Sequence, residues 1–452
     1  MHIHILGICG TFMGGLALLA KEMGYRVSGS DLNTYPPMSN QLKQAGIEVF
    51  SGYKKVHIDP VPDLVIIGNS ISRGNEIVEY LLNKRLNFTS GPQWLADNVL
   101  KEKKVLAVSG THGKTTTSSM LAWILEYSDL NPGFLIGGIP KDFGISARLG
   151  ESEYFVIEAD EYDTAFFDKR SKFIHYTATV LIINNIEFDH ADIFSDIEDI
   201  KKQFHHYVRT IPSKGAIIRL DDDENIDDVI QRGCWTPIQG FHVQDTKSIW
   251  HTENISNDLR AFDIVYNKKN MGRISWELSG LHNISNCLAA VAASHSVGVP
   301  IKKAIKALND FKNVKRRMEF LGNANGIDLY DDFAHHPTAI KKTLYGLRKL
   351  KKSGKIFLIL DIRSNSMKMG SHAHELPDSL KIADHIFLTK SSELSWDIEK
   401  ALSSIKEKIS ISDNTADILF NVKKSARKGD AIIVMSNGIM KGIHESLLEQ
   451  LS

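Results

Sequence analysis

The segment SGTHGKTTT at residues 109–117 has the residue types of a phosphate-binding loop. It lies between an apolar stretch, KVLAV, and a helical pattern, SSMLAWILEY, and such a loop requires this order of strand, loop and helix. Backbone N–H groups and the start of the helix can then surround phosphate oxygens, while Lys114 adds a positive charge and the Thr115 hydroxyl can bind Mg²⁺. The loop is shorter than the standard one, because Val108 stands where its first glycine is expected. The residues predicted to contact a nucleotide are Gly110, Thr111, His112, Gly113, Lys114, Thr115 and Thr116.

Acidic side chains follow two further apolar stretches, EYFVIEADEYD at 153–163 and TVLIINNIEFDH at 179–190. A carboxylate at the end of a neighbouring buried strand usually completes the oxygen ligands of a phosphate-bound Mg²⁺. The candidates are Glu158, Asp160, Glu161 and Asp163 in the first stretch, and Glu187, Asp189 and the imidazole of His190 in the second. The residue types alone do not select among them.

Short apolar stretches alternate with helical patterns along most of the chain, which predicts βαβ units and an α/β fold with parallel sheets. A first unit begins with HIHIL, a second opens at KVLAV after the charged stretch KEKK, and a third begins after NDFKNVKRRMEFLG. Between about 212 and 280, acidic and Gly/Asn turns separate short strands, so we expect a β-rich insertion or an extension of the central sheet. Helices are expected at about 283–297 and from about 337.

The composition argues for a soluble protein that does not bind polyanions in general. Lys plus Arg and Asp plus Glu both number 54, so we expect no nucleic-acid partner. The three cysteines, Cys9, Cys234 and Cys287, follow no paired spacing, which favours a reducing cytoplasm. No apolar run approaches the ~18 residues of a membrane span, and the N-terminus has no basic leader, so no membrane anchor is expected.

Six motifs occur in one order along the chain: GTHGKTTT, EADEYD, NNIEFDH, LHNISN, KRRME and DDFAHHPT. With this set the chain resembles the Mur ligases, which form amide bonds with ATP. The resemblance implies an α/β protein of three domains. These are a Rossmann-like domain at 1–102 that holds a UDP-sugar, a central P-loop ATPase domain at 103–313, and a Rossmann-like C-terminal domain at 314–452 that brings the amine or peptide. The related folylpolyglutamate synthetase branch is disfavoured by the HHPT and KRRME motifs.

The resemblance also assigns roles at the nucleotide. It makes Lys114 a phosphate contact, Thr115 and Glu158 ligands of one Mg²⁺, and His190 a ligand of a second. Asn283 and Asn286 fall where the family holds adenosine. The family's C-terminal domain brings further residues to the nucleotide and reaction centre, and the matching positions are Arg317, Asp331 and His335. For these three, an ordinary interdomain salt bridge is the alternative interpretation. The implied catalytic set is Lys114, Glu158, His190 and His335.

The C-terminal domain distinguishes two branches that act on UDP-N-acetylmuramate. The branch that adds L-alanine has a Pro-His-Arg-Tyr motif after a C-terminal strand, whereas LDIRSNSMKMG at 360–370 is similar to the branch that adds the tripeptide L-Ala-γ-D-Glu-meso-diaminopimelate. SNGIMKGIH at 436–444 also resembles that branch, although Asp361-Ile362 and Ile439 depart from its pattern. Arginine suits bidentate binding of a carboxylate. The residues expected to bind the peptide are Arg363, Ser364, Asn365 and Lys368.

The resemblance places the UDP-sugar at the N-terminal turn GICGTFMGG, with Gly10, Thr11 and Asp31 as expected contacts. The same turn is a degenerate dinucleotide fingerprint, but its spacing is not G-x-G-x-x-G, which disfavours a dehydrogenase. The expected partners are therefore UDP-N-acetylmuramate, ATP with Mg²⁺ and a muropeptide-derived tripeptide, in a monomer or weak homo-oligomer that takes part in cell-wall recycling. Ligation of L-alanine, or a regulatory module that only hydrolyses ATP, are the alternatives.

Overall fold

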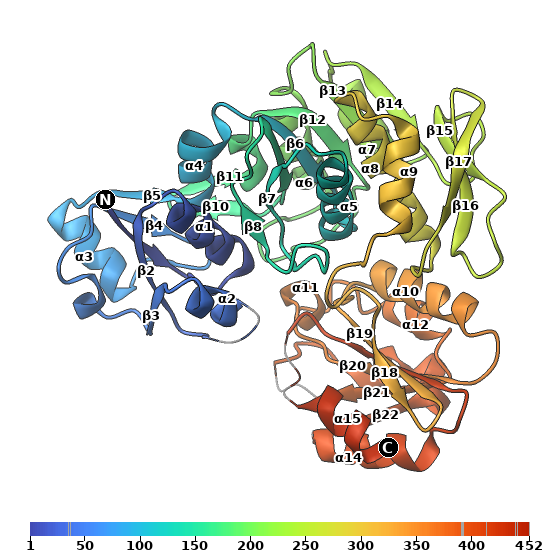
Figure 1. The fold of residues 1–452 in the computed structure, drawn as a ribbon. Helices are drawn as coiled ribbons and strands as arrows, with labels where there is room; N and C mark the ends of the chain where they lie inside the picture. Colours follow the sequence, from blue (N-terminus) through green and yellow to red (C-terminus); the bar gives the residue numbers. More distant parts are fainter. Residues whose placement is uncertain are drawn as a thin grey trace.

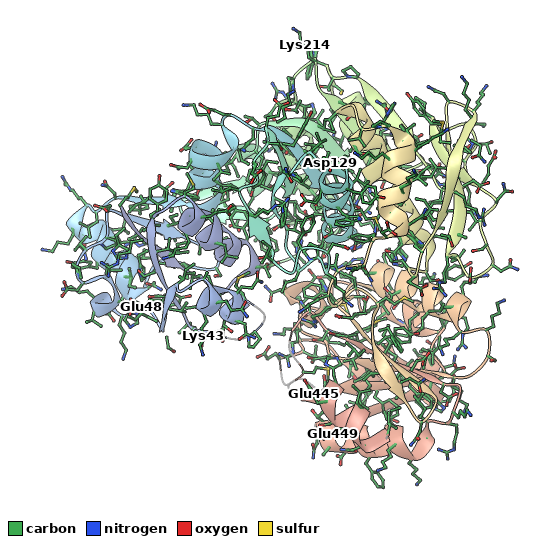
Figure 2. The ribbon with its side chains drawn as sticks, in the orientation of Figure 1. Lys43, Glu48, Asp129, Lys214, Glu445 and Glu449 are labelled. Atoms are coloured by element: carbon green, nitrogen blue, oxygen red, sulfur yellow. The ribbon has the colours of Figure 1, made fainter. Side chains whose placement is uncertain are left out.

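The fold is that of a computed structural model, which describes residues 1–34, 36, 38–389, 393–412, 414–438, 440 and 442–451. Three α/β units follow one another along the chain, as the alternating pattern predicts. In Figure 1 the N-terminal unit, in blue, lies beside the central unit, and the C-terminal unit, in orange and red, lies below it. Charged side chains such as Lys214 and Glu449 extend from the outer surface (Figure 2). Within the described ranges, no helix is long and apolar enough to cross a membrane.

The N-terminal unit is a parallel sheet with the Rossmann-like strand order β3-β2-β1-β4-β5. Its strands are β1 (His2–Leu6), β2 (Arg26–Asp31), β3 (Glu48–Ser51), β4 (Leu64–Ile67) and β5 (Phe88–Ser90). Its α-helices are α1 (Thr11–Glu22), α2 (Met38–Gln44), α3 (Glu76–Lys84) and α4 (Gly91–Leu95). Because only four residues separate the end of β1 from the start of α1, the N-terminus of α1 lies at the carboxyl edge of the sheet, where ligands of such sheets bind.

The central unit is built on a sheet of order β17-β16-β15-β14-β13-β12-β6-β9-β7-β8. Its strands are β6 (Lys104–Ser109), β7 (Gly133–Leu135), β8 (Ala147–Arg148), β9 (Tyr154–Glu158), β12 (Ala178–Ile183), β13 (Ala216–Leu220), β14 (Ile238–Phe241), β15 (Trp250–Glu253), β16 (Ala261–Tyr266) and β17 (Lys269–Ser275). The segment at about 212–280 therefore extends the central sheet, which was one of its two predicted forms. A hairpin, β10 (Asp163–Ala165) with β11 (Asp168–Ser171), lies outside this sheet.

Helices cover the central sheet and bring the motifs together. They are α5 (Lys114–Tyr127), α6 (Ile197–Val208), α7 (Glu224–Gln231), α8 (Leu281–Ser296) and α9 (Ile301–Asn309). Strand β6 is a run of apolar residues because it lies between β9 and β12 and is buried. Its Val108 pairs with Glu158 and its Ser109 pairs with Ile183, so the loops that follow all three strands meet at one edge. Helix α8 packs beside α5 and carries the LHNISN motif to the same edge.

The C-terminal unit has the strand order β18-β19-β23-β20-β21-β22, in which only β18 is antiparallel to its neighbour among the described strands. Its strands are β18 (Glu319–Ala324), β19 (Ile327–Asp332), β20 (Ile356–Leu360), β21 (His385–Thr389), β22 (Ile409–Ser412) and β23 (Ala431–Met435). Its α-helices are α10 (Pro337–Leu350), α11 (Asn365–Lys368), α12 (Leu376–Leu380), α13 (Ile398–Ala401), α14 (Thr415–Ser425) and α15 (Ile443–Leu451). Residues Ile439 and Lys441 of the SNGIMKGIH motif lie outside the described residues.

The N-terminal and central units share an apolar core, whereas the C-terminal unit has cores of its own. One continuous cluster of buried side chains takes Leu16 and Trp94 from the N-terminal unit and Phe155 and Tyr207 from the central unit. Helix α1 even packs on the central strands β7 and β8, where Gly15 faces Leu135 too closely to admit a larger side chain. The C-terminal unit has two apolar cores of its own, and among the described residues neither takes a member from before Met318. The N-terminal and central units therefore form one body, to which the C-terminal unit is docked.

This division of the cores predicts two unfolding transitions. Trp94→Ala should destabilise the joint N-terminal and central body by about 3–5 kcal/mol, the usual cost of removing a buried aromatic side chain. Leu447→Ala, in a core of the C-terminal unit, is the matched control and should move the other transition. Calorimetry of both variants checks this. A single transition that both substitutions lower equally would show that the three units unfold as one.

Candidate active site

The phosphate loop is held in a conformation that only its glycines permit. Gly110 and Gly113 have φ angles of +121° and +85°, in the region that L side chains rarely adopt. A Cβ on Gly113 would also collide with the side-chain amide of Asn286. The loop is tied to the end of β12, because the His112 amide donates a hydrogen bond to Asn185 Oδ1 at 2.8 Å. The N-terminus of α5 is thereby left facing the loop, as phosphate binding requires.

Thr115 and Glu158, the predicted ligands of one Mg²⁺, are adjacent. Thr115 Oγ1 donates to Glu158 Oε1 at 2.9 Å, and the Gly137 amide donates to Glu158 Oε2 at 2.7 Å. Arg317 Nη2, from the start of the C-terminal unit, donates to the same Thr115 hydroxyl at 2.9 Å. A hydroxyl beside a fixed carboxylate at a phosphate loop is the oxygen donor set that Mg²⁺ prefers, so the residues fit this ion.

Lys114 enters a buried cluster of charges behind the loop. Its Nζ lies 2.7 Å from Glu161 Oε2 and 3.6 Å from Asp160 Oδ1, and His190 Nε2 lies 3.4 Å from Glu161 Oε1. Burial alone would lower the pKa of Lys114, but the charges of Glu161 and Asp160 outweigh it and raise the pKa. In the same way burial would raise the pKa of Asp160, yet Lys172 and Lys114 hold it well below its usual range.

Two further basic residues belong to this site, and only one was predicted. His190 stands in the left-handed region, at φ +57°, and its side chain turns toward Glu161 and Asp160 as a second metal position would require. Lys172 was not predicted, although its Nζ donates to Asp160 at 3.0 Å and is buried. Lys172 lies outside the motifs, directly after the β10–β11 hairpin, so no sequence signal marked it.

A cavity of about 730 Å³ lies between the central and C-terminal units next to the phosphate loop. The lining includes the predicted His112, Gly113, Thr116, Asn283, Asn286 and Arg317. Asp331, also predicted there, faces elsewhere: it lies near Arg316 and His444, while Asp332 lines the cavity. This difference follows from the alternation of side chains along β19, which turns neighbouring residues to opposite faces. A nucleotide contact at Asp331 stays a prediction.

A smaller cavity, of about 220 Å³, brings the predicted peptide residues next to His190. Its lining combines His190 of the central unit with His335, Arg363, Ser364 and Asn365 of the C-terminal unit. Hydrogen bonds between the two units hold the walls together: Asn365 Nδ2 donates to Asp192 at 2.9 Å, Ser366 Oγ donates to Asp189 at 2.8 Å, and the Ala191 amide donates to Ser366 Oγ at 3.2 Å. Lys368 does not line this cavity, because it ends α11 and forms an ion pair with Glu393.

Arg363 is held in place by its neighbours in the C-terminal unit. Its Nε donates to Asp361, the residue that departs from the expected Glu, and Asp361 is fixed by Thr389 Oγ1 at 2.8 Å and Ser436 Oγ at 3.1 Å. Gly438 lies against the Arg363 side chain, and a Cβ there would collide with it. The guanidinium is thus oriented by a buried carboxylate, while about half of the side chain stays exposed to solvent.

The predicted UDP-sugar contacts surround the N-terminus of α1. Gly10 is its N-cap and Thr11 its first residue, and both are exposed. Asp31 is buried, and its carboxylate accepts hydrogen bonds from the amides of Cys9 at 2.8 Å and Asn33 at 2.9 Å. It therefore fixes the shape of the turn. This end of α1 is near the charge cluster, because the Lys172 ammonium lies 5.8 Å from the ring centre of Phe12. An anion at α1 would therefore lie on the side of the domain that faces the phosphate loop.

Buried neutral histidines lie on both sides of the interface between the central and C-terminal units. Burial lowers the pKa of His282 and of His335 to about 4, and that of His336 to about 3. His335 Nδ1 donates to the carbonyl of Phe333 at 2.9 Å, which leaves Nε2 unprotonated. Among the described residues, His282 Nδ1 and His336 Nε2 have no hydrogen-bond partner.

Three family models match the chain in succession. Residues 2–103 match the model described as "Mur ligase family, catalytic domain", residues 108–294 match "Mur ligase middle domain", and residues 316–438 match "Mur ligase, glutamate ligase domain". The chain is 49% identical to the UDP-N-acetylmuramate–L-alanyl-γ-D-glutamyl-meso-2,6-diaminoheptandioate ligase of Haemophilus influenzae, over all of this chain and 99% of the relative. It is 34% identical to the UDP-N-acetylmuramate–L-alanine ligase of Caldicellulosiruptor bescii, over 96% and 95%. A crystal structure of a murein peptide ligase from Psychrobacter arcticus is 46% identical, with a TM-score of 0.79 over 100% of this chain and 98% of that one.

The buried histidines predict that acidification destabilises the protein. Between pH 6.5 and about 4 the unfolded chain takes up protons on His282 and His335 while the folded protein does not. The free energy of unfolding therefore falls as the pH falls, by up to about 1.4 kcal/mol per pH unit for each such histidine. His335→Asn keeps a donor for the Phe333 carbonyl and should flatten this dependence in denaturant titrations at pH 7 and pH 5. An unchanged slope would show that His335 is protonated in the folded state.

Proposed function

Because the chain belongs to the Mur ligase family, we propose that it joins the tripeptide L-Ala-γ-D-Glu-meso-diaminopimelate to UDP-N-acetylmuramate in the recycling of cell-wall peptides. The chain is an ATP-dependent ligase that forms amide bonds. Two observations together support the choice of substrate. Full-length identity is 49% to relatives named for this tripeptide, and the RSN segment that distinguishes the tripeptide branch lines the cavity at His190.

The first step activates the carboxylate of the UDP-sugar. An oxygen of the lactyl carboxylate attacks the γ-phosphorus of ATP, its bond to ADP breaks, and an acyl phosphate forms. Lys114 and the backbone N–H groups of the phosphate loop offset the charge on the transferring group. When bound, Mg²⁺ would be held by Thr115 and Glu158, and a second ion by His190, and the ions would neutralise charge on the phosphates. Arg317 joins Thr115 to the C-terminal unit, so the nucleotide site is complete only when that unit is docked.

The second step forms the amide. The alanyl amine nitrogen of the tripeptide attacks the acyl carbon, the C–O bond to phosphate breaks, and the nitrogen loses a proton. We assign the acceptor role to His335, because its Nε2 is unprotonated and the residue lines the cavity beside His190. His190 is less suited, since it is assigned to the second metal ion and lies 3.4 Å from Glu161.

The N-terminal turn and the C-terminal loop position the two substrates. We assign Gly10, Thr11 and Asp31 to the UDP-sugar, whose diphosphate suits the N-terminus of α1. Arg363, with Ser364 and Asn365, is assigned to a carboxylate of the tripeptide.

The wider setting follows from the same proposal. The proposed domains are residues 1–102, 103–313 and 314–452. We propose that the protein is cytoplasmic, because the reaction consumes ATP and the three cysteines are unpaired. We also propose that it is a monomer or a weak homo-oligomer. Its partners are then small molecules alone, without nucleic acid or membrane.

The proposal is tested by phosphate release from Mg-ATP with UDP-N-acetylmuramate present. Three arms are compared: added tripeptide, added L-alanine and no amine, with mass spectrometry of the UDP-linked product. We expect release that depends on the tripeptide and a product larger by the tripeptide less one water. Dependence on L-alanine would assign the chain to the biosynthetic branch instead, and equal release in all arms would leave a protein that only hydrolyses ATP.

Arg363→Ala should raise the KM for tripeptide by roughly tenfold or more while the KM for ATP changes little, since a hydrogen bond to a charged group contributes about 1.5–3 kcal/mol. Lys368→Ala is the matched control, because Lys368 is a cation of the same segment that lies outside the cavity. Steady-state kinetics with varied tripeptide measure both. An unchanged peptide KM in the Arg363 variant, or an equal rise in the Lys368 variant, would remove Arg363 from the peptide site.

A further inference from the structure

The C-terminal unit is held on the central unit by polar contacts. Its apolar cores are separate, and the described contacts across the interface include hydrogen bonds, ion pairs and ring contacts, together with a close approach of Gly346 in α10 to Gly280 at the start of α8. Polar contacts exchange with water more readily than an apolar core, so this unit is the one that can open and close. The position of the closed state must then be set by a few specific pairs.

Glu187 makes one of these pairs with the first turn of α10. Its Oε2 accepts a hydrogen bond from Thr338 Oγ1 at 2.6 Å, and its Oε1 lies 3.9 Å from Lys342 Nζ. Thr338 is the second residue of the helix, where the unpaired N–H groups favour a negative charge. Burial would raise the pKa of Glu187, but His112 and Thr338 outweigh it and lower the pKa to about 2, so the carboxylate is charged.

The same residue is joined to the phosphate loop. The Glu187 amide donates to Thr111 Oγ1 at 2.8 Å, and Thr111 Oγ1 donates to the Glu187 carbonyl at 3.2 Å. Glu187 Oε2 also lies 3.4 Å from His112 Nε2. Glu187 thus contacts both the phosphate loop and α10, the helix with which the C-terminal unit docks on the central unit.

His112, Glu187 and His336 lie close enough to suggest a metal site, but hydrogen bonding argues against it. The backbone N–H of Thr338 donates to His336 Nδ1 at 3.2 Å, so His336 Nδ1 carries no proton. Its pKa of about 3 keeps the ring neutral, and the single proton is therefore on Nε2. Neither nitrogen is free to bind a metal while His336 caps α10.

We propose that Glu187 is a positioning residue that couples docking of the C-terminal unit, through Thr338 of α10, to the phosphate loop at Thr111 and His112. The inference rests on the proposed ligase activity. An acyl phosphate hydrolyses if water reaches it, so the docked state must outlast the intermediate. Weakening this contact opens the site early, and phosphate is then released without amide formation.

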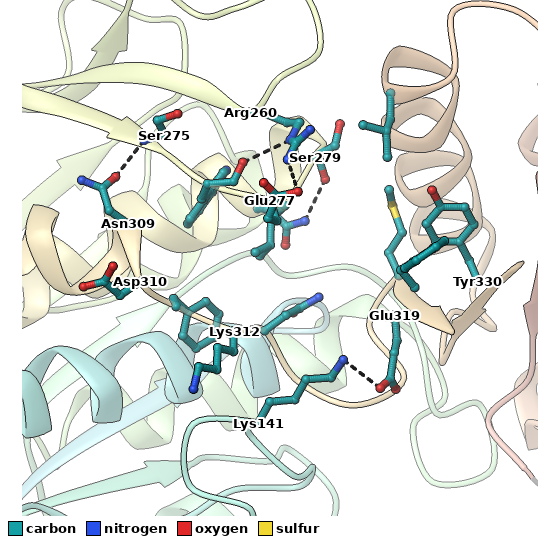
Figure 3. Close-up of a pocket in the computed structure, with 18 of the residues that line it drawn as sticks. Lys141, Arg260, Ser275, Glu277, Ser279, Asn309, Asp310, Lys312, Glu319 and Tyr330 are labelled. Carbon is teal, nitrogen blue, oxygen red and sulfur yellow. Dashed lines mark hydrogen bonds and ion pairs between the residues drawn. The ribbon is translucent and has the colours of Figure 1, made fainter. Parts of the chain in front are cut away.

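A second ion pair crosses the same interface away from the phosphate loop, and it supplies the control. Lys141 Nζ lies 2.8 Å from Glu319 Oε1 (Figure 3), at a neighbouring cavity of about 710 Å³ on the same interface. Glu319→Gln removes one interdomain carboxylate, as Glu187→Gln does, but away from the phosphate loop. A general loss of interface stability would affect both variants alike.

The experiment measures phosphate released per amide bond formed, with UDP-N-acetylmuramate, tripeptide and Mg-ATP. We expect a ratio near one for the wild type and for Glu319→Gln, and a ratio raised several-fold in Glu187→Gln, with kcat for amide formation reduced roughly tenfold, as loss of about 1.4 kcal/mol would give. Thr338→Val should give the same phenotype, and the double variant should be no worse than either single one. Thermal unfolding of all variants accompanies the kinetics.

Two results would overturn the coupling role. The ratio in Glu187→Gln could equal that of Glu319→Gln, or the effects of Glu187→Gln and Thr338→Val could add fully, which would mean that they act separately. Wild-type ligation in the same assay keeps these failures apart from failure of the proposed function. If the wild type forms no amide, the proposed activity is wrong. If it does and the ratios match, only the coupling is wrong.

Discussion

The buried ion pair between Lys114 and Glu161 is the interaction on which the rest of the site depends. Asp160 and Glu161 follow the end of β9, behind the phosphate loop. Without a cation between them, their two negative charges would repel each other in a medium of low dielectric. Lys114 supplies that cation from the first turn of α5, and His190 and Lys172 extend it. The phosphate loop, the end of β9 and the loop after β12 are therefore set relative to one another by charge as well as by the sheet.

The packing around this cluster holds two of the three units fixed and leaves the third able to move. The N-terminal and central units share an apolar core, which fixes the turn at α1 relative to the phosphate loop. The C-terminal unit is docked through polar pairs such as Arg317 with Thr115 and Ser366 with Asp189, and these can break and form again. A ligase that makes a water-sensitive intermediate needs both properties, because the UDP-sugar must meet ATP in a fixed geometry and the peptide must enter and the product leave.

Local patterns predicted much of this. The fold class and the family follow from motifs whose order and strand context are visible in the sequence, and both are confirmed. What the sequence could not give depends on tertiary contact. Lys172 reaches Asp160 from a hairpin with no motif, and the pairing of Glu187 with α10 exists only after two units dock. Which of Asp331 and Asp332 lines the large cavity depends on the pairing of β19 in the sheet, and Lys368 lies outside the small cavity because it pairs with Glu393.

The central claim is that this site activates a carboxylate by transferring phosphate to it, and oxygen isotopes test that transfer directly. UDP-N-acetylmuramate carrying ¹⁸O in both oxygens of its lactyl carboxylate would be turned over with Mg-ATP and the tripeptide, and the released phosphate analysed by mass spectrometry. An acyl phosphate that breaks at its C–O bond leaves one ¹⁸O in each phosphate and one in the new amide. Phosphate without ¹⁸O, formed while amide accumulates, would contradict the account.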